Sequence, residues 1–181
     1  MALGKDDKEK ILQLREKRIK LSEQRESVKK RNEYGHDVVA KINQSLGLGK
    51  SLSEYDPAVK LPVDFIRKPD FKECPGLVAA YISEGKAFDI LSCCGQVSGK
   101  LKGTLGFDDH AFVGATNVEF LQLQNLVETA KLLNDSVLFC PQSSDSIILV
   151  DYYVTSGVIE DLQFSIVVQG QDLEHKFACC F

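Results

Sequence analysis

The sequence lacks any unbroken apolar run of about 18 residues, the length that a membrane-spanning helix needs. Its first residues, 1–8, run directly into charged side chains, where a secretory signal peptide would place an apolar block. We therefore expect no membrane partner and an intracellular location, cytoplasmic or nuclear. With 181 residues, of which 44% are hydrophobic and 27% charged, the chain has the composition of a globular protein and the length for one ordinary domain plus an appendage.

A complete phosphate-binding motif is also missing. Residues 49–51, Gly-Lys-Ser, match the end of such a loop, but the glycine that the motif requires at position 44 is Gln44. Residues 95–100 also end in Gly-Lys and are one residue too short for the same motif. We interpret the two segments as a helix cap and a hairpin turn, and we expect no cofactor.

The best candidate for acid–base chemistry is the run Asp108, Asp109 and His110, which falls on a predicted loop between strands. A polar turn explains the same three residues without any chemistry. We therefore predict no catalytic residues and a protein that is not an enzyme. The alternative is a small enzyme whose site is assembled from residues distant in sequence.

The six cysteines could indicate zinc or disulfides: Cys74, Cys93, Cys94, Cys140, Cys179 and Cys180. Structural zinc draws on cysteines about two to four residues apart, whereas four of these six form two adjacent pairs. We predict a strand at both pairs, and neighbours on a strand point to opposite faces, so one site could use only one member of each pair. An intracellular location disfavours disulfides. We expect buried free thiols and no metal site.

Proline and glycine are both absent from Lys5 to Glu33, a run of good helix formers that predicts one long helix. Its apolar residues form a narrow seam, which repeats every seven residues at what would be the d positions of a coiled coil, while arginines occupy two of the a positions. A helix with so little apolar surface is not stable alone in water. We therefore predict an interface along this seam, formed by Ile11, Leu14, Leu21 and Val28.

Two kinds of partner are open to the predicted helix. Tyr34 and Gly35 interrupt the run, and a second amphipathic segment follows up to Gly47, so the two segments could fold into an intramolecular hairpin. Alternatively, one helix of about 40 residues absorbs Gly35 at a cost of about 1 kcal/mol and pairs with a second copy. We favour the second arrangement, a homo-oligomer, and among such assemblies we favour a dimer.

The net charge of −4 divides unevenly along the chain. Residues 1–47 hold 12 Lys and Arg against 8 Asp and Glu, a net +4, and residues 48–181 hold 10 against 18, a net −8. A basic segment before an acidic body is compatible with a nucleic-acid partner. The densest basic cluster, and the candidate phosphate contact, is Lys29, Lys30 and Arg31.

The remainder of the chain predicts a small α+β domain. Four of the five prolines fall between residues 51 and 76, so we expect an extended strap over 48–76. A helix is predicted from the capping box at Thr116–Glu119 to Asn134, and residues 77–83 are ambiguous between helix and strand. Strands are predicted at 87–94, 101–107, 111–115, 137–140, 146–154, 162–169 and 175–181. This order predicts one helix packed on an antiparallel sheet.

These expectations divide the chain into a charged helical oligomerisation arm (1–47), a proline-rich strap (48–76) and an α+β domain (77–181). They favour a non-enzymatic adaptor or scaffold in which the arm sets valency and the domain docks a protein partner. Nucleic-acid binding through the basic arm is the alternative. In neither case do we expect a metal ion.

Overall fold

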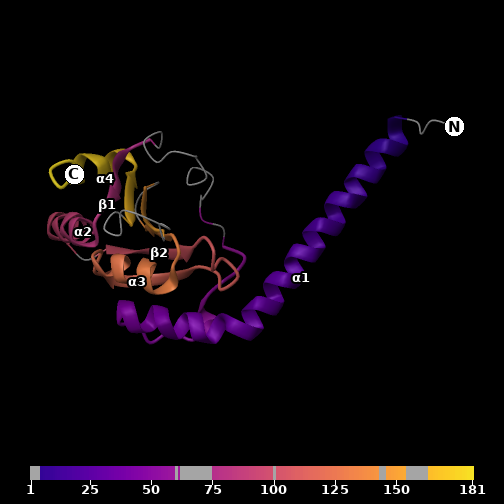
Figure 1. Cartoon of the computed structure of the whole chain (residues 1–181), viewed down its shortest axis with the longest axis horizontal. Coiled ribbons are helices and arrows are strands. Elements are labelled where there is room, and N and C mark those ends of the chain that lie inside the picture. Colours follow the sequence, from indigo (N-terminus) through magenta and orange to yellow (C-terminus); the bar gives the residue numbers. More distant parts are fainter. Residues whose placement is uncertain (1–4, 60, 62–74, 100, 143–145, 154–162) are drawn as a thin grey trace.

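The computed structural model describes residues 5–59, 61, 75–99, 101–142, 146–153 and 163–181. It confirms the α+β class: a long N-terminal helix precedes a six-stranded antiparallel sheet with further helices (Figure 1). The helices are α1 (Lys5–Leu46), the short 3-10 helix η1 (Leu52–Glu54), α2 (Glu84–Ser98), α3 (Asn125–Leu133) and α4 (Gln171–Phe177). The strands are β1 (Leu77–Ile82), β2 (Leu101–Phe107), β3 (Thr116–Leu121), β4 (Val137–Pro141), β5 (Ile147–Tyr152) and β6 (Phe164–Gln169).

The sheet has the strand order β1-β6-β5-β4-β2-β3, and every pairing among the described strands is antiparallel. β5 is a central strand in which successive apolar side chains serve two different clusters. Ile148 and Val150 belong to the main core, whereas Leu149 belongs to a smaller cluster. Because strand side chains alternate between faces, a continuously apolar strand of this kind is buried on both sides.

One face of the sheet is covered by helices. The main core includes residues of α2, α3 and α4 together with the C-terminal part of α1, where Ile42 is completely buried. α1 lies along α3 (Figure 1), and the two helices are joined by a 2.8 Å hydrogen bond between Ser45 Oγ and Thr129 Oγ1. The end of the long helix is therefore part of the body and not a separate appendage.

The opposite face of the sheet carries a second apolar cluster. It consists of the buried side chains Leu138, Ile147, Leu149 and Val167, against which Leu61, Val78 and Cys140 pack. The predicted strap over 48–76 lies largely outside the described residues, since residues 60 and 62–74 are not among them.

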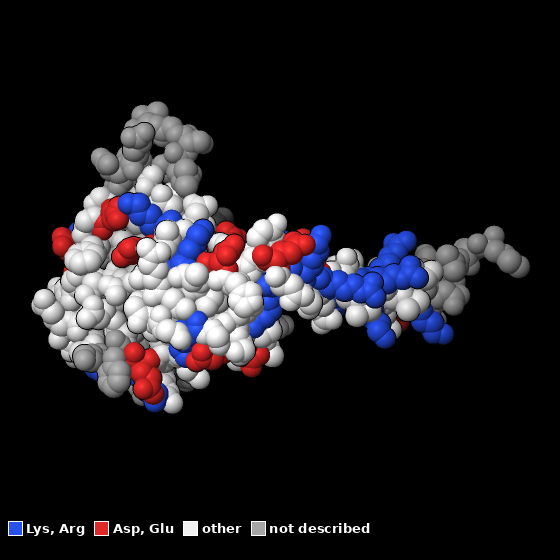
Figure 2. Space-filling model, turned by 90° about the horizontal axis from the view of Figure 1, so that it is seen from below, with Lys and Arg blue, Asp and Glu red and all other residues white. Residues whose placement is uncertain are grey.

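α1 is one continuous helix, so the hairpin alternative does not occur. Gly35 lies inside α1 and is buried. The 3-10 helix η1 approaches so closely here that a Cβ at position 35 would lie 2.9 Å from Leu52 Cδ2. Gly47, with a φ of +65°, follows the last helical residue, as the sequence predicts for a C-cap. The N-terminal part of α1 extends away from the body (Figure 1), and lysines and arginines gather along it (Figure 2).

The strand predicted at 87–94 is wrong, because these residues belong to α2. Ser83 caps the helix by accepting a hydrogen bond from the Lys86 amide, and the buried residues Ala87, Ile90, Leu91 and Cys94 are three or four positions apart, as on one helix face. Short apolar runs cannot be assigned by composition, and here the helical period decides.

The helix predicted from Thr116 is also misplaced, because it begins only at Asn125. Residues 116–121 instead form β3, which pairs with β2 at the edge of the sheet. Residues 111–115, predicted as a strand, form a turn that ends in a single bridge between Ala115 and Asp56. Pairing with β2 overrides the local capping-box pattern, since that pattern competes with a whole ladder of strand hydrogen bonds.

The strand predicted at 175–181 is wrong as well, because α4 and a turn occupy the C-terminus. The Glu174 carboxylate accepts a hydrogen bond from the Gly170 amide at 2.9 Å, and Leu173 and Phe177, four positions apart, are both buried. With α2 and α4 assigned, the described residues place three helices of the body on the sheet instead of the single predicted one.

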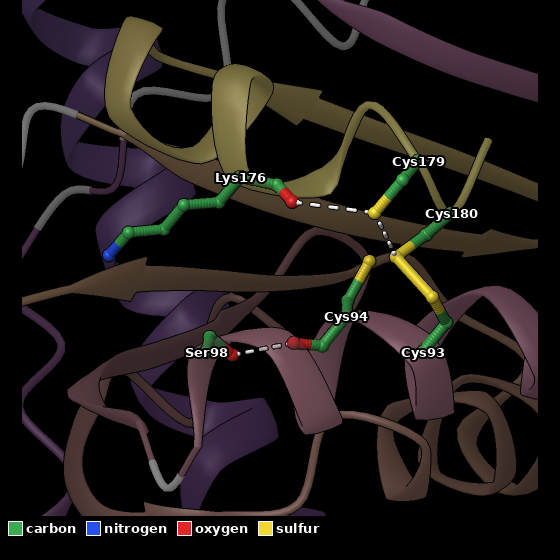
Figure 3. The surroundings of a disulfide bond; sticks show 6 residues. All are labelled: Cys93, Cys94, Ser98, Lys176, Cys179 and Cys180. Atoms are coloured by element: carbon green, nitrogen blue, oxygen red, sulfur yellow. Dashed lines mark hydrogen bonds between the residues drawn. A yellow bond between two sulfur atoms is a disulfide. The ribbon is translucent and has the colours of Figure 1, made fainter.

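Both adjacent cysteine pairs lie in a helix or a turn and not on the predicted strands, and this difference alters the cysteine chemistry. Cys93 on α2 forms a disulfide with Cys180 in the C-terminal turn (Figure 3), which corrects the expectation that every cysteine is a free thiol. Cys94, Cys140 and Cys179 are free, and Cys74 lies outside the described residues. Only the expected cellular location disfavours a disulfide at the level of the sequence, whereas the tertiary structure brings together two cysteines that are 87 positions apart.

Candidate protein-docking surface

The projecting part of α1 carries apolar side chains that nothing in the described chain covers. From Glu9 to Lys30 every residue except the half-buried Ser27 is exposed. The predicted interface residues share this exposure, with exposed fractions between 38% and 60% for Ile11, Leu14, Leu21 and Val28. We call these four residues the seam. An apolar side chain left in water forgoes about 1.5–3 kcal/mol relative to full burial, so the seam is a candidate surface for a partner.

The seam continues into the buried face of the same helix. On an ideal helix with 3.6 residues per turn, Ile42 lies within about 40° of Val28. Ile42 is fully buried against the body, whereas Val28, two heptads earlier, is 59% exposed. A chain that lies on the seam would therefore follow the side of α1 that contacts the body.

Basic residues surround the seam. Projected on an ideal helix, five cations fall within about 60° of Leu14, namely Lys10, Lys17, Arg18, Arg25 and Lys29. The acidic residues between positions 9 and 33 all lie at least about 100° away from it, and they are Glu9, Glu16, Glu23, Glu26 and Glu33. The net charge of the arm is thus concentrated on the apolar side, which is a feature that its modest total does not reveal.

Within the described part of the chain, one of these five cations has an ion pair: Lys29 pairs with Glu33 at 3.8 Å. Lys30, which is not one of the five, pairs with Glu26 at 3.2 Å. Among the residues that the structure describes, Lys17, Arg18 and Arg25 have no ion-pair partner. They remain available to an acidic group that approaches along the seam.

The proposed phosphate cluster is divided by the fold. Lys29 and Lys30 point to solvent, but Arg31 is turned toward the body. Its guanidinium donates hydrogen bonds to the carbonyl oxygens of Leu52 and Tyr55 at 2.8 and 2.7 Å, and also to that of Val113. Arg31 thus ties α1 to two other segments and is not available for a phosphate. Sequence reasoning could not find this role, because the acceptors are backbone oxygens 21 to 82 positions away.

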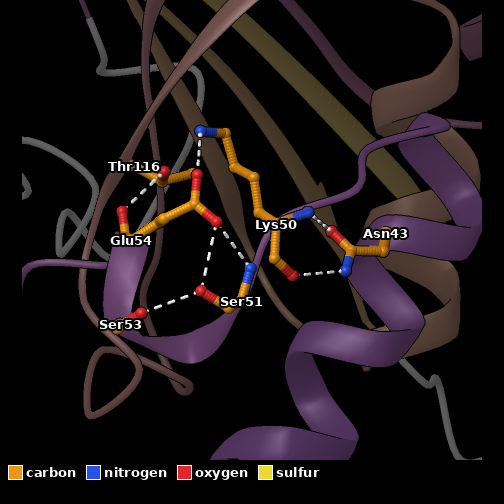
Figure 4. Close-up of polar contacts among 6 residues, drawn as sticks. All are labelled: Asn43, Lys50, Ser51, Ser53, Glu54 and Thr116. Carbon is orange, nitrogen blue, oxygen red and sulfur yellow. Dashed lines mark hydrogen bonds and ion pairs between the residues drawn. The ribbon is translucent and has the colours of Figure 1, made fainter.

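The segment after α1 is fixed by a second set of polar contacts (Figure 4). The Asn43 side chain donates to the Lys50 carbonyl at 2.7 Å and accepts from the Lys50 amide at 3.2 Å. Glu54 accepts from the Ser51 amide at 2.8 Å, and this hydrogen bond is the main reason why the pKa of Glu54 lies below its usual value. The Gly-Lys-Ser segment is therefore engaged in ending α1 and starting η1, so that the helix leaves the body in a defined direction.

The candidate acid–base residues form a structural turn. The buried Asp135 carboxylate accepts hydrogen bonds from the Asp109 and His110 amides at 2.8 and 3.0 Å, and it contacts His110 Nδ1 at 2.8 Å. Asp108 donates its amide to the Ser136 carbonyl. Asp135 was missed by sequence reasoning because it is about 25 positions away and carries no motif. Its hydrogen bonds organise the loop between β2 and β3.

Comparison with known proteins supplies no relative: no protein-family model matches the chain, and neither the curated proteins nor the solved structures contain a significant match. Within the described residues, no helix is both long and apolar enough to cross a lipid bilayer. The surface along α1 must therefore be interpreted from its own geometry and charge.

Proposed function

We propose that this protein is a non-enzymatic docking protein whose projecting helix binds a helix of another chain. The observation that carries the proposal is the exposed seam on a rigidly anchored helix. Leu14, Leu21 and Val28 recur at the seven-residue interval that helix pairs use, and the body fixes the direction of α1 through Arg31 and the contacts around Asn43. A preorganised helix loses little conformational entropy on binding, which favours affinity.

Charge complementarity selects an acidic amphipathic helix as the partner. Such a helix would place leucine-like side chains on the seam and carboxylates beside Lys17, Arg18 and Arg25. Self-pairing would instead set like charges together: in a parallel dimer, Arg18 of each copy would face its equivalent, and Lys10 would face Arg15 of the second copy. An antiparallel dimer would also bring like charges together, because every charged residue at the e and g positions between residues 10 and 31 is positive.

A binding experiment with two designed peptides tests this proposal. Both peptides are four-heptad helices with leucine at the a and d positions, and one has glutamate and the other lysine at e and g. We expect fluorescence anisotropy to show binding of the glutamate peptide to the full chain and at least about tenfold weaker binding of the lysine peptide. Equal binding of both, or binding of neither, would contradict the proposal.

Matched variants locate the contact on the helix. The double substitution Leu14→Ser and Leu21→Ser should weaken binding of the glutamate peptide by at least about tenfold, because it removes two buried anchors. The control is Leu12→Ser with Ile19→Ser, which changes two equally exposed apolar residues on the opposite flank. We expect the control to alter the affinity less than about twofold. Circular dichroism would verify that all variants keep their helix.

A homodimer is the second candidate, because the seven-residue spacing is present in every copy of the chain. Sedimentation equilibrium of the full chain distinguishes a homodimer from a chain that binds an acidic helix of another protein. A monomer at micromolar concentration agrees with an acidic partner. A dimer that the Leu14→Ser and Leu21→Ser variant converts to monomer would instead identify the second copy as the occupant of the seam.

Nucleic acid is the remaining alternative and has a distinct signature. Phosphate binding would depend on Lys17, Arg18 and Arg25 and would fall steeply with salt, but it would not depend on Leu14 or Leu21. A mobility-shift titration with a short duplex, carried out on the wild type and on the double serine variant, separates the cases. Tight and strongly salt-dependent binding that both proteins share equally would replace the protein-docking proposal.

A further inference from the structure

Three sulfur atoms converge where α2 meets the C-terminal turn (Figure 3). They belong to Cys93, Cys179 and Cys180, and all three lie within 4.8 Å of one another. Cys93 is on the third turn of α2, and the other two are in the turn that follows α4. Adjacent cysteines would diverge on a strand, but in this turn both can face the same point. The fold thus creates a thiol cluster from two segments that no sequence spacing connects.

The cluster has the dimensions of a metal site. A Zn–S bond is about 2.3 Å, so two thiolates at tetrahedral angles around Zn²⁺ lie about 3.8 Å apart. The Sγ atoms of Cys179 and Cys180 are 3.9 Å apart in the structure. Cys93 is bonded to Cys180 in the oxidised form, and cleavage of that bond would allow its sulfur to reach a similar separation.

We propose that the reduced chain binds one Zn²⁺ through the thiolates of Cys93, Cys179 and Cys180. A water molecule completes the tetrahedral shell on the side of Cys179, which is the exposed member of the three. Thiolates are the soft ligands that Zn²⁺ accepts in structural sites. The disulfide and the zinc site are therefore two alternative links between α2 and the C-terminus.

The chemical balance requires a reductant. Cleavage of the Cys93–Cys180 bond consumes two electrons and two protons and gives two thiols; a dithiol supplies both, whereas a phosphine supplies the electrons, water supplies the protons and the phosphine becomes its oxide. Cys179 supplies the third thiol, and zinc binding then releases one proton from each. Zinc uptake should accordingly be strong in the reduced chain and weak in the oxidised chain.

The remaining described cysteines lie outside this cluster. Cys94 is buried in the main core, and its sulfur is not among the three that converge. Cys140 packs on the other face of the sheet, where burial raises the pKa of its thiol to about 11. Cys140 therefore offers a control that is chemically matched but spatially separate.

Zinc titration of the full chain tests the proposal. The protein is reduced with a phosphine, freed of metal and titrated against a chromophoric zinc chelator, and Co²⁺ replaces Zn²⁺ in a parallel spectroscopic experiment. We expect one equivalent of zinc per chain and a Co²⁺ spectrum with thiolate charge transfer and intense tetrahedral bands. Oxidation to the disulfide form should reduce the zinc affinity by at least about 100-fold, since it removes two of the three ligands.

Two variants decide whether the cluster is responsible. Cys179→Ser leaves the disulfide pair intact but should weaken zinc binding by roughly 10- to 100-fold, whereas Cys140→Ser should leave it unchanged. Absence of zinc uptake by the reduced chain would overturn the proposal. So would equal losses in both variants or undiminished binding by the oxidised chain. Near-identical circular dichroism spectra would show that the variants remain folded.

Discussion

The two ends of α1 have similar apolar patterns and opposite surroundings. Near the C-terminal end of the helix, Val38, Val39, Ile42 and Leu46 are at most 9% exposed, and they form part of the core. In the seam the apolar side chains are 38% to 60% exposed. One continuous helix thus contains a segment that the chain itself covers and a segment that it leaves open.

This difference shows that periodicity reveals which side of a helix is to be buried but not what buries it. The C-terminal part of α1 gains its stability from α3 and η1, since isolated helices are marginal in water. The projecting part has good helix formers and a firm anchor at one end, but its apolar side remains in water. The comparison is the physical basis for expecting a partner there.

The strongest test of this comparison replaces one apolar residue in each segment. Ile42→Ala should lower the free energy of unfolding by about 2–5 kcal/mol, because it leaves a cavity in a fully buried site. Leu14→Ala should change it by less than about 0.5 kcal/mol, because an exposed side chain loses no packing. Urea denaturation of both variants provides the measurement. A comparable loss for Leu14→Ala would mean that the seam is already covered in the purified protein.

A second test concerns the point where the two segments meet. Arg31→Ala should lower the free energy of unfolding by about 2–3 kcal/mol, since it leaves several partly buried carbonyl oxygens without their charged donor. Its neighbour Lys30 is exposed and pairs only with Glu26, so Lys30→Ala should cost no more than about 0.5 kcal/mol. Similar losses for both would show that the guanidinium contacts contribute little.

A third test uses pH, to which the body should respond through Asp151. Burial raises the pKa of this carboxyl group above its usual value, the Ser136 hydrogen bond opposes the shift, and nearby Asp135 adds to it. A raised pKa in the folded state favours folding below the unfolded-state pKa, and this contribution is lost as pH rises through the folded-state value. Asp151→Asn should therefore increase the free energy of unfolding by about 1 kcal/mol at neutral pH and have little effect near pH 3.

The control for this pH test is a carboxylate on the projecting segment. Glu23→Gln removes an exposed charge and should change the free energy of unfolding by less than about 0.5 kcal/mol at either pH. Chemical denaturation of the wild type and of both variants, at neutral pH and near pH 3, measures the change in the free energy of unfolding for each variant at each pH. An Asp151→Asn variant that is destabilised equally at both would show that its hydrogen bond to Ser136 outweighs the cost of burying the charge.

The smallest expected effect lies within the projecting segment itself. Glu26→Gln removes the 3.2 Å ion pair with Lys30 and should destabilise the helix by about 0.2–0.5 kcal/mol. Circular dichroism at low salt should show a slight loss of helicity, and the melting temperature of the body should not change. A large loss of helicity would indicate that side-chain ion pairs hold this segment in its helical form, and would weaken the case for a missing partner.

The sequence predicts much of the secondary structure, and its errors have a common cause. β2, β4, β5 and β6 lie where alternating or continuous apolar residues predict them. α2, α4 and β3 were assigned wrongly because short apolar segments fit more than one period, and the choice depends on neighbours such as β2 that are distant in sequence. The candidate docking residues were accessible to sequence reasoning, since a helix determines its own faces.

What the sequence determined by itself is the long helix, the position of its apolar seam and the basic charges beside it, because all three depend on residues a few positions apart. Only the tertiary structure decided that Arg31 faces the body, that Asp135 organises the turn after β2, and that Cys93 meets Cys179 and Cys180. These arrangements join segments separated by 21 to 87 positions. No local pattern encodes them, because the free energy that selects them comes from packing the whole sheet and its helices.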